Sequence, residues 1–514
     1  MPWWLLSMKV PTKEISNVND KAVNQKAETQ HYDVLIVGAG ISGIAAGRYL
    51  KTFRPNDSFA ILEEKNTFGG TWDTHKYPGI RSDSDLYTFG YSFKPWIGPP
   101  IASAQEILSY LGEVIDENNL DSTIQYGQRI TKANWCSSSN LWNLDVTNLN
   151  SGQTSQIKAK FLWMCQGYYR HSKGYTPNWD GMEDFEGDIL HPQDWPDDFS
   201  GNGKEIVVIG SGATAATLIP NIADDCKHVT MLQRSPTFFL TAKNANELAD
   251  TLREIEIDEE VIHPIVRKRI VYDQAAFTLR CRTEPDQVKK ELLSMIKIHL
   301  GDDYDIDKHF TPDYRPWRQR LAFVPDADLF KSIASGKASV VTDEIERFTS
   351  KGLLLKSGEE LGADTIVTAT GFNLSVLGDI EFSIDNTSLA FNETVTYRGM
   401  MFTGMPNFAW VFGYFRASWT LRSEMVAEFL CKLFDHMEEN SISSVVPALR
   451  ESDKTMPILP WVDEEDFNPG YLQREGHLLP KRGNVNEWQH SQDYWTESKE
   501  FAEIDLNDDV FVYR

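Results

Sequence analysis

Two glycine-rich loops in this chain have the residue types and spacing that can bind a pyrophosphate. The first is Gly38-Ala39-Gly40-Ile41-Ser42-Gly43, and the second is Gly210-Ser211-Gly212-Ala213-Thr214-Ala215-Ala216. In such a loop the first glycine permits a tight turn, the second lets the backbone approach the phosphates, and a small third residue lets a helix pack closely on a strand. The free N–H groups at the start of that helix would bind the pyrophosphate. We therefore predict two dinucleotide sites.

The first loop stands in the setting that a dinucleotide site requires. An apolar run at 31–37 predicts a buried strand before the loop, and residues 44–50 predict a helix after it. The next strand, at 59–62, ends at Glu63, which lies 20 residues beyond Gly43, where an acid commonly binds a ribose. A glycine turn followed by a chance acid is the alternative interpretation.

The second loop differs from the first in the residue type at the end of the next strand. A strand at 205–209 precedes the loop, and the next strand, at 228–232, leads into Gln233-Arg234-Ser235 without an acid. A carboxylate there would repel a 2′-phosphate, whereas the guanidinium of Arg234 can bind one with paired hydrogen bonds. This pattern predicts NADPH at the second site. The alternative is that Arg234 is a solvated charge at a strand end.

The segment between the two loops has the pattern F-x-G-x-x-x-H-x-x-x-W-P-D, with Phe185, Gly187, His191 and Trp195. It resembles the fingerprint of the flavin-dependent Baeyer–Villiger monooxygenases. Two earlier segments, at 69–74 and 77–85, resemble the G-G-T-W and Y-P-G-x-R-x-D segments of the same family, and most closely the subgroup that contains the ethionamide-activating monooxygenase. The resemblance covers roughly residues 32–500. Taken singly, His191 would be an ordinary loop histidine and Trp195 a core residue.

The resemblance implies FAD at the first site and NADPH at the second. It also implies that His191 is a hinge or relay between the two nucleotide domains rather than the main acid–base group. The residues expected to bind the cofactors are Gly38, Gly40, Ser42, Gly43, Glu63, Gly70, Thr71, Trp72, Asp73, Thr74, Arg81, Ser82, Asp83, Ile130, Gly210, Ser211, Gly212, Ala213, Thr214, Ala215, Ala216, Arg234 and Ser235.

A further segment, at 310–321, matches the subgroup's F-T-P-x-Y-x-P-W-x-x-R-L pattern. In that family the final arginine enters the active site, so the resemblance assigns Arg320 as the catalytic cation and Asp83 as the carboxylate that positions it. Arg315 and Arg318 are alternatives for this charge. Gln319 stands where family members often carry lysine, which leaves a second phosphate cation in doubt.

The resemblance leads to a specific hypothesis about the reaction. An anionic flavin C4a-peroxide would attack a ketone and insert one oxygen of O2, giving an ester or a lactone. A fixed guanidinium in a water-shielded site would keep the oxygenated flavin negatively charged. Sulfoxidation is expected as well. The alternatives are an N- or S-oxygenating flavin monooxygenase and, from another class, a non-catalytic flavin-binding sensor.

These motifs predict an α/β fold with two Rossmann-like domains of the FAD/NAD(P)-binding type. We expect a disordered extension at 1–30, an FAD-binding domain at 31–170 and 371–514, an NADP-binding domain at 171–240 and 320–370, and a helical insertion at 241–319. Apolar residues at 3- and 4-residue spacing predict a helix at 285–300. Another helix is expected at about 418–437, and the aromatic residues after Ser452 are expected to pack onto the surface.

Composition excludes several other classes of protein. The 514 residues carry 50 basic and 75 acidic side chains, a net charge of −25 that repels nucleic acid and anionic lipid. Five cysteines without C-x-x-C spacing indicate neither a disulfide framework nor a redox dithiol, which argues against a disulfide reductase and favours the cytoplasm. No metal site and no transmembrane segment are predicted. The apolar run around Trp3 and Trp4 is too short to cross a membrane, and a weak anchor at the membrane interface is the alternative interpretation of these two residues.

Overall fold

The computed structural model describes residues 29–514. The expectations for residues 1–28, including the interfacial anchor at Trp3 and Trp4, lie outside the described residues. The first strand, β1, begins at Gln30, which is the last residue of the predicted extension and lies one residue before the predicted start of the FAD-binding domain. Within the described residues no helix is long and apolar enough to cross a membrane.

The larger sheet has nine strands and carries the first glycine loop. Its order is β20-β19-β4-β5-β6-β1-β2-β3, and β23 pairs with β6. Strand β1 is central and parallel to both β2 and β6. The strands are β1 (Gln30–Val37), β2 (Phe59–Leu62), β3 (Ile124–Gln125), β4 (Gln128–Cys136), β5 (Leu141–Asn148), β6 (Thr154–Met164), β19 (Glu381–Ile384), β20 (Thr387–Ser388) and β23 (Phe408–Trp410).

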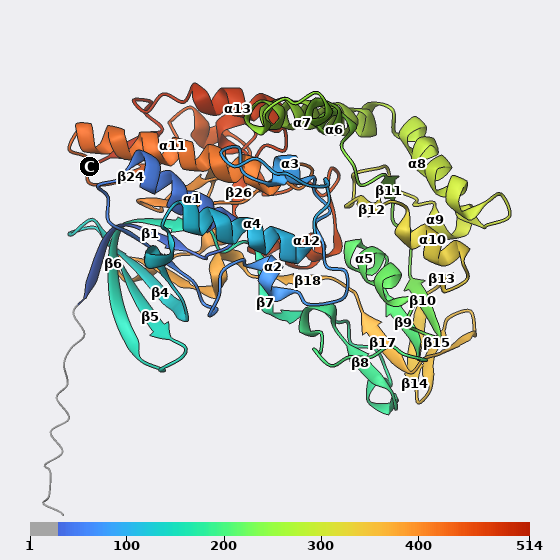
Figure 1. Cartoon of the computed structure of the whole chain (residues 1–514). Helices are drawn as coiled ribbons and strands as arrows, with labels where there is room; N and C mark the ends of the chain where they lie inside the picture. The colour runs from blue at the N-terminus through green and yellow to red at the C-terminus, as the bar shows by residue number, and fades with distance from the viewer. Residues whose placement is uncertain (1–28) are drawn as a thin grey trace, which may run out of the picture.

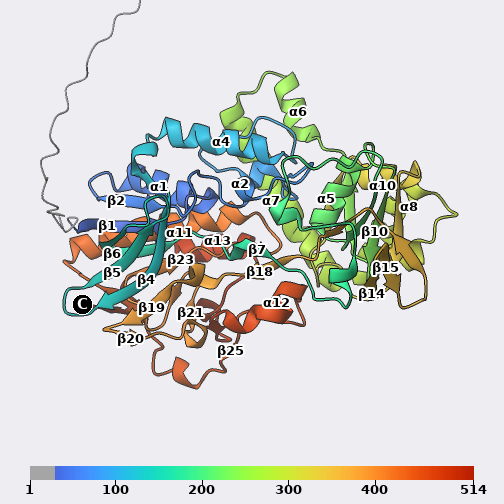
Figure 2. The same ribbon diagram turned by 90° about the horizontal axis from the view of Figure 1, so that it is seen from below.

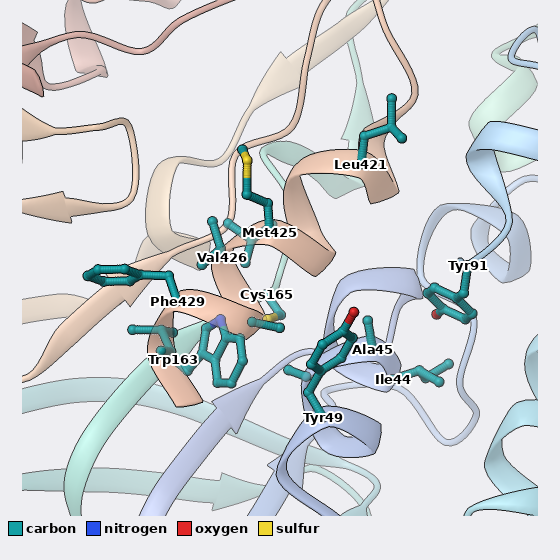
Figure 3. Close-up of a cluster of buried hydrophobic side chains, with 14 of the residues drawn as sticks. Ile44, Ala45, Tyr49, Tyr91, Trp163, Cys165, Leu421, Met425, Val426 and Phe429 are labelled. Carbon is teal, nitrogen blue, oxygen red and sulfur yellow. The ribbon is translucent and has the colours of Figure 1, made fainter. Parts of the chain in front are cut away.

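The helices α1 (Ile41–Phe53) and α11 (Trp419–Glu439) pack against each other over this sheet (Figure 1). Their apolar faces and the strand residues beneath them form the main core. Tyr49 of α1, Trp163 of β6 and Phe429 of α11 meet there (Figure 3). The helix α1 is longer than the predicted 44–50, because it begins directly after the N-cap Gly40 and continues to Phe53.

The smaller sheet has five parallel strands and carries the second glycine loop. Its order is β13-β10-β9-β17-β8. The helices α5 (Ala213–Ile222) and α10 (Asp328–Ala334) pack together beside it, with Ile219, Leu329 and Phe330 in their shared core. The strands are β8 (Asp188–Leu190), β9 (Glu205–Ile209), β10 (His228–Gln233), β13 (Ala338–Thr342) and β17 (Thr365–Thr368).

Two short strands pair where the chain passes between the sheets. The strand β7 (Tyr169–Gly174) leads away from the larger sheet, and β18 (Phe372–Leu374) leads back to it. They are antiparallel to each other, so the outgoing and returning connections lie side by side (Figure 2).

A helical segment is inserted after β10. The strands β11 (Phe239–Ala242) and β12 (Ala322–Pro325) pair in parallel at its two ends. The helix α7 packs on α3 (Leu86–Phe89) and α13 (Tyr494–Ala502) at the larger sheet, while α8 packs on α10 at the smaller one, so the insertion bridges both units (Figure 1). The helix predicted at 285–300 is confirmed as α8. The helices are α6 (Glu247–Glu254), α7 (Glu259–Thr283), α8 (Pro285–Leu300) and α9 (Ile306–Phe310).

The C-terminal segment is built into the core, which corrects the expectation that it packs onto the surface. Trp461, Phe467 and Trp488 expose 3%, 2% and 0% of their surface. They complete the apolar cores on the two faces of the larger sheet, so burial of these rings drives the packing.

The remaining α-helices and short paired strands are α2 (Thr71–Thr74), α3 (Leu86–Phe89), α4 (Ala104–Glu117), α12 (Gly470–Glu475), α13 (Tyr494–Ala502), β14 (Ile345–Thr349), β15 (Gly352–Leu355), β16 (Glu360–Gly362), β21 (Thr396–Tyr397), β22 (Met401–Phe402), β24 (Val445–Pro447), β25 (Leu459–Pro460), β26 (Lys481–Arg482) and β27 (Phe511–Tyr513).

Candidate active site

The first glycine loop connects β1 to α1 and leaves the start of that helix uncapped. Gly40 is the N-cap of α1 and makes no side-chain capping bond, so the first N–H groups of the helix have no partner there. Gly38 has φ +98°, and a Cβ on Gly43 would lie 1.8 Å from the Gly38 carbonyl oxygen. Both positions therefore require glycine. Ser42, at the start of α1, accepts a hydrogen bond of 2.8 Å from Trp419 Nε1.

Glu63 holds the first loop from the end of β2. Its Oε2 accepts a hydrogen bond of 2.7 Å from Ala39 N, and its Oε1 accepts one of 2.9 Å from Lys65 N. Burial raises the pKa of Glu63, while these two backbone bonds oppose that shift. Each carboxylate oxygen keeps a second lone pair, so a ribose hydroxyl can still donate to this side chain.

The segment at 69–74 lies against the same loop. Gly70 has φ +57°, and a Cβ there would lie 3.2 Å from Gly40 Cα, so the two backbones form a narrow cradle. Asp73 is ion-paired with Lys65 at 3.2 Å and with Lys76 at 3.3 Å. The other predicted residues are half-buried: the Thr74 hydroxyl donates to the Gly70 carbonyl oxygen, Trp72 packs edge-on against Phe89, and Thr71 begins α2.

The remaining residues predicted for this site are more widely spread. Arg81 Nη1 lies 2.5 Å from the carboxylate of Asp328 on α10, and therefore connects the two units. Ser82 is buried and donates to the Ser84 carbonyl oxygen. Ile130 lies in β4 with its side chain in the apolar core, which leaves only its backbone for a cofactor contact.

The second glycine loop connects β9 to α5 in the same way. Gly210 has φ +123°, and Gly212 is the N-cap of α5 without a side-chain capping bond. Ser211 shares a hydrogen bond of 2.8 Å with Thr237. Ala213 and Thr214 open α5, and Ala215 and Ala216 are buried within it, while Arg234 and Ser235 are exposed just beyond β10. Arg234 is therefore not part of the core and is accessible to solvent.

The fingerprint segment lies where the chain passes between the units. Phe185 is buried in the core of the smaller sheet, and a Cβ on Gly187 would lie 2.4 Å from the Asp364 carbonyl oxygen. His191 Nδ1 accepts a hydrogen bond of 3.1 Å from Gln193 N, so Nε2 carries the proton and donates to the Gly371 carbonyl oxygen at 3.3 Å. Burial lowers the pKa of His191.

Two further contacts hold the fingerprint segment in place. The His191 ring lies against Gly174 of β7, because a Cβ there would come within 1.9 Å of Cε1. Trp195 packs edge-on against Phe199 at 4.8 Å between ring centroids. The imidazole thus contacts both the outgoing and the returning connection, a position suited to a hinge.

Arg320 and Asp83 form a bidentate ion pair across 237 residues of sequence. Arg320 Nε donates to Oδ2 at 2.8 Å, and Nη2 donates to Oδ1 at 2.6 Å. The Asp83 charge raises the pKa of Arg320 further above its usual value, so the guanidinium stays charged at any working pH. Its side chain still keeps 40% of its accessible surface, which leaves one edge open to a ligand. Arg315 pairs instead with Asp466 at 2.7 Å.

A cluster of tyrosines beside this pair was missed from the sequence. Arg320 interacts electrostatically with Tyr168, Tyr169 and Tyr471. The Tyr168 hydroxyl donates to that of Tyr169 at 2.8 Å, and burial raises the pKa of Tyr168 well above its usual value. For Tyr168 and Tyr169 the available signal was their place just after β6, because ligands of parallel sheets bind at the carboxyl ends of strands.

Stacked rings connect this cluster to the first glycine loop. Tyr168 stacks on Trp419 at 5.5 Å, and Trp419 in turn donates its Nε1 hydrogen to Ser42. Arg320, the tyrosine cluster and the loop at the start of α1 are therefore parts of one continuous packed arrangement.

A cavity of about 1060 Å³ lies between α7, the segment that precedes α11 and the C-terminal segment. Its apolar wall includes Leu279, Phe415, Ala417, Leu421, Trp461 and Phe467. Neither Arg320 nor Asp83 is among the described residues that line it. The pocket is large enough for a drug-sized molecule.

The residues of the first site fit a dinucleotide. The uncapped start of α1 offers N–H groups to a pyrophosphate, and beside it the backbones of Gly40 and Gly70 lie close together without intervening side chains. The Gln166 backbone packs against Gly38, and both polar atoms of its side-chain amide are buried without a hydrogen-bond partner among the residues that the structure describes. A polar ligand beside the loop would satisfy such groups. Over residues 29–514, no cluster of three or more metal-ligating side chains is found.

Sequence comparisons now place the chain among known proteins. It is 44% identical over 469 residues to the FAD-containing monooxygenase EthA of Mycobacterium tuberculosis, covering 91% of this chain and 94% of that protein. The chain belongs to the FAD-containing monooxygenases. It is also 40% identical over 487 residues to the probable FAD-binding monooxygenase AlmA of an Acinetobacter species, covering 94% and 96% of the two chains. The flavin-binding monooxygenase-like family matches residues 92–248, and an NAD(P)-binding Rossmann-like domain matches residues 36–99.

Solved structures with the same fold are more distant in sequence. An oxidized steroid monooxygenase bound to NADP is 21% identical, with a TM-score of 0.73 over 94% of this chain and 99% of the other. A cyclohexanone monooxygenase bound to epsilon-caprolactone is 19% identical, with a TM-score of 0.72 over 95% and 100%. These likenesses confirm the predicted α/β fold with a Rossmann-like domain. Membership of a family of FAD-containing monooxygenases argues against the sensor hypothesis.

Proposed function

We propose that this enzyme is a Baeyer–Villiger monooxygenase that uses NADPH and FAD to insert one oxygen atom of O2 beside a ketone carbonyl. The overall reaction consumes the ketone, O2, NADPH and a proton, and yields an ester or lactone, NADP⁺ and water. FAD, when bound and reduced, supplies the activation of oxygen. The observation that carries the proposal is the bidentate pair between Arg320 and Asp83.

Arg320 provides a fixed positive charge at the proposed reaction site. The two bonds from Asp83 fix the orientation of its guanidinium, and 40% of the side chain remains accessible to a reacting group. A preorganised cation of this kind stabilises developing negative charge without having to reorient during the reaction. Asp83 serves as the positioning carboxylate, because both of its oxygens accept from Arg320.

The tyrosine cluster places neutral phenols close to this charge. Tyr168 is 8% exposed, and its elevated pKa keeps the phenol neutral near pH 7. Neutral phenols can donate hydrogen bonds without cancelling the Arg320 charge.

The second glycine loop supports NADPH as the reductant. The uncapped start of α5 offers N–H groups for a pyrophosphate, and the exposed Arg234 lies at the end of the next strand, where a 2′-phosphate is bound in such folds. One distant structure of the same fold has NADP bound. Another has epsilon-caprolactone bound, which is the lactone that oxygen insertion into cyclohexanone would give.

Product analysis tests the proposal. The purified FAD-loaded enzyme is given NADPH with cyclohexanone, a linear ketone or an aryl sulfide, and the products are identified by mass. We expect an ester or lactone from at least one ketone. NADPH consumption that yields only hydrogen peroxide with every ketone contradicts the proposal. Sulfoxide formation without ester favours the heteroatom oxygenase that the flavin-binding monooxygenase-like family match also allows.

Replacement of Arg320 tests the residue assignment. In Arg320→Ala we expect ester formation to fall on the order of 10²-fold or more, because the site loses its fixed cation. The rate of flavin bleaching by NADPH in the absence of oxygen should stay within about twofold, since Arg320 lies outside the second glycine loop. If Arg318→Ala abolished ester formation and Arg320→Ala did not, the catalytic charge would belong to Arg318.

A further inference from the structure

Asp466, in the C-terminal segment, binds three guanidinium groups from three different parts of the chain. Arg282 at the end of α7 lies 2.9 Å from its carboxylate, and Arg315 and Arg416 each lie 2.7 Å from it. Arg315 belongs to the loop that carries Arg320, and Arg416 precedes α11 at the larger sheet. We refer to these four residues as the Asp466 cluster. It joins the helical insertion, the Arg320 loop and the larger sheet.

Arg416 is the buried centre of this cluster. Its side chain is 1% exposed. Its Nη1 donates to Asp466 Oδ2 at 2.7 Å, and its Nη2 donates both to the Asp466 carbonyl oxygen at 2.7 Å and to the Trp317 carbonyl oxygen at 3.1 Å. Burial lowers the pKa of Arg416, and the neighbouring arginines add to that shift, so the guanidinium depends on the Asp466 carboxylate for its charge balance.

The Trp317 carbonyl belongs to a strained turn three residues before Arg320. Trp317 has φ +62°, in the left-handed region that is unfavourable for a bulky side chain. The next residue of the loop, Arg318, is also held by the C-terminal segment, because Asn468 N donates to the Arg318 carbonyl oxygen at 2.9 Å. A conformation of this kind persists only when surrounding contacts determine it. Here the contacts come from Arg416 and from the C-terminal segment around Asp466.

We propose that Asp466 and Arg416 are positioning residues, which hold the loop at 311–320 so that the Arg320 guanidinium meets Asp83 and faces the reacting atoms. This inference rests on the role of Arg320 proposed above. Asp83 fixes the guanidinium end of Arg320, and the Asp466 cluster fixes its backbone end. Both ends must be fixed, because a displacement of about 1 Å can cost on the order of 10²-fold in rate.

The cluster is also part of the cavity wall. Arg282, Arg416 and Asp466 all line the cavity of about 1060 Å³. A molecule bound there therefore contacts the groups that hold the Arg320 loop. Relaxation of the Trp317 turn would turn Arg320 away from Asp83 without disturbing either glycine loop, so the defect should affect oxygen transfer and leave hydride transfer intact.

Two substitutions test the positioning role in the FAD-loaded full-length enzyme. Asp466→Asn keeps the shape of the side chain and removes the charge that holds three guanidiniums together. Arg416→Lys keeps the charge but replaces the two guanidinium nitrogens with one ammonium nitrogen, which cannot reproduce the fork geometry of the bonds to Asp466 and to the Trp317 carbonyl. In both variants we expect the amount of ester formed per NADPH consumed to fall roughly 10- to 100-fold, with hydrogen peroxide formed in its place. FAD retention and the anaerobic rate of flavin reduction should stay within about twofold.

A control and a double substitution separate positioning from general stability. The control is Arg280→Gln. Arg280 lies on the same helix as Arg282 but pairs with Glu291 and not with Asp466, so the ester yield of this variant should match that of the wild type. Adding Asp466→Asn to Arg320→Ala should lower the yield no further than Arg320→Ala alone, because both changes act on one side chain.

The outcomes distinguish this inference from the proposed function. Wild-type ester yield in Arg320→Ala would refute the proposed function and the positioning role together. A loss in Arg320→Ala with wild-type yield in both Asp466→Asn and Arg416→Lys would refute the positioning role alone. A parallel loss of FAD, flavin reduction and ester in both variants, or additive losses in the double variant, would also refute it, since that is the behaviour of a purely structural contact.

Discussion

At the scale of single residues, the site combines one open cation with neutral groups around it. Arg320 is paired with Asp83 yet keeps 40% of its surface, whereas Arg416 is paired with Asp466 and keeps 1%. The same ion-pair chemistry therefore serves two purposes. The guanidinium of Arg320 has an exposed edge that is available to a ligand, and the guanidinium of Arg416 is paired within the fold and holds its neighbours in place.

Arg234 gives a test of coenzyme choice at this scale. In Arg234→Gln we expect the ratio of kcat/KM for NADPH to that for NADH to fall roughly 10- to 100-fold. The reason is that a charge-assisted hydrogen bond contributes about 1.5–3 kcal/mol and tenfold in affinity corresponds to about 1.4 kcal/mol. Steady-state kinetics with both coenzymes measure the ratio. The value of kcat/KM for NADH serves as the internal control, and an unchanged ratio would place the 2′-phosphate elsewhere.

At the scale of elements, each glycine loop binds through the helix that comes directly after it. Both α1 and α5 begin without a side-chain cap, which leaves their N–H groups for a ligand. The loops differ at the third small position. Gly43 leaves no room for a Cβ, whereas Ala215 carries one and is fully buried. The first loop is thus the more tightly packed of the two.

Gly43→Ala tests this difference. The added methyl would lie 1.8 Å from the Gly38 carbonyl oxygen, so we expect the loop to shift, with a loss of about 1–3 kcal/mol in the free energy of unfolding and a weaker hold on FAD. Flavin absorbance after gel filtration and a denaturant titration measure the two effects. The matched control is Gly112→Ala in α4, where the methyl would meet only Phe68 Cζ at 3.4 Å. Equal FAD retention in both variants would contradict the packing argument.

At the scale of the whole molecule, the two sheets are held together by the insertion and by the C-terminal segment. The helix α7 crosses from the insertion to the larger sheet, where His263 Nε2 lies 3.0 Å from the Tyr91 carbonyl oxygen and Arg267 pairs with Glu424 at 2.7 Å. The Asp466 cluster then ties the end of α7 to the Arg320 loop. Packing of α7 and geometry at the active site are therefore connected.

His263 makes this packing sensitive to acid. Burial lowers its pKa from 6.5 to about 4; the Arg267 charge adds to the shift, and Glu259 opposes it. Between these values the unfolded chain binds more protons than the folded one, so the free energy of unfolding should fall as the pH falls below about 6.5. The loss from this group is at most about 2 kcal/mol at pH 5, with one pKa unit worth about 1.4 kcal/mol.

Denaturant unfolding at pH 7, 6 and 5 checks the acid effect. His263→Gln keeps a donor for the Tyr91 carbonyl oxygen and does not titrate, so the decline with pH should be shallower in this variant than in wild type. Other buried histidines keep their own contributions, because burial also lowers the pKa of His75 to about 3 and that of His171 to about 4. Parallel declines in the two proteins would show that His263 does not contribute.

Local features of the chain were predictable from the sequence by itself. The strands before each glycine loop, the predicted helix at 285–300 and the strand ends at Glu63 and Gln233 depend on side-chain periodicity and on glycine backbone freedom, which act over a few residues. Family resemblance added the pairing of Asp83 with Arg320, and the structure shows that contact at 2.6 Å.

The tertiary structure alone decided which distant groups meet. The tyrosine cluster beside Arg320 and the three arginines on Asp466 come from segments separated by tens to hundreds of residues, and no local pattern indicates that these groups meet. The C-terminal aromatic residues were expected to pack onto the surface, yet Trp461, Phe467 and Trp488 are buried, because they cover apolar area of the cores on the two faces of the larger sheet. Burial and ion pairing depend on which segments, distant in sequence, become neighbours in the folded chain, and the packing of the whole fold determines this.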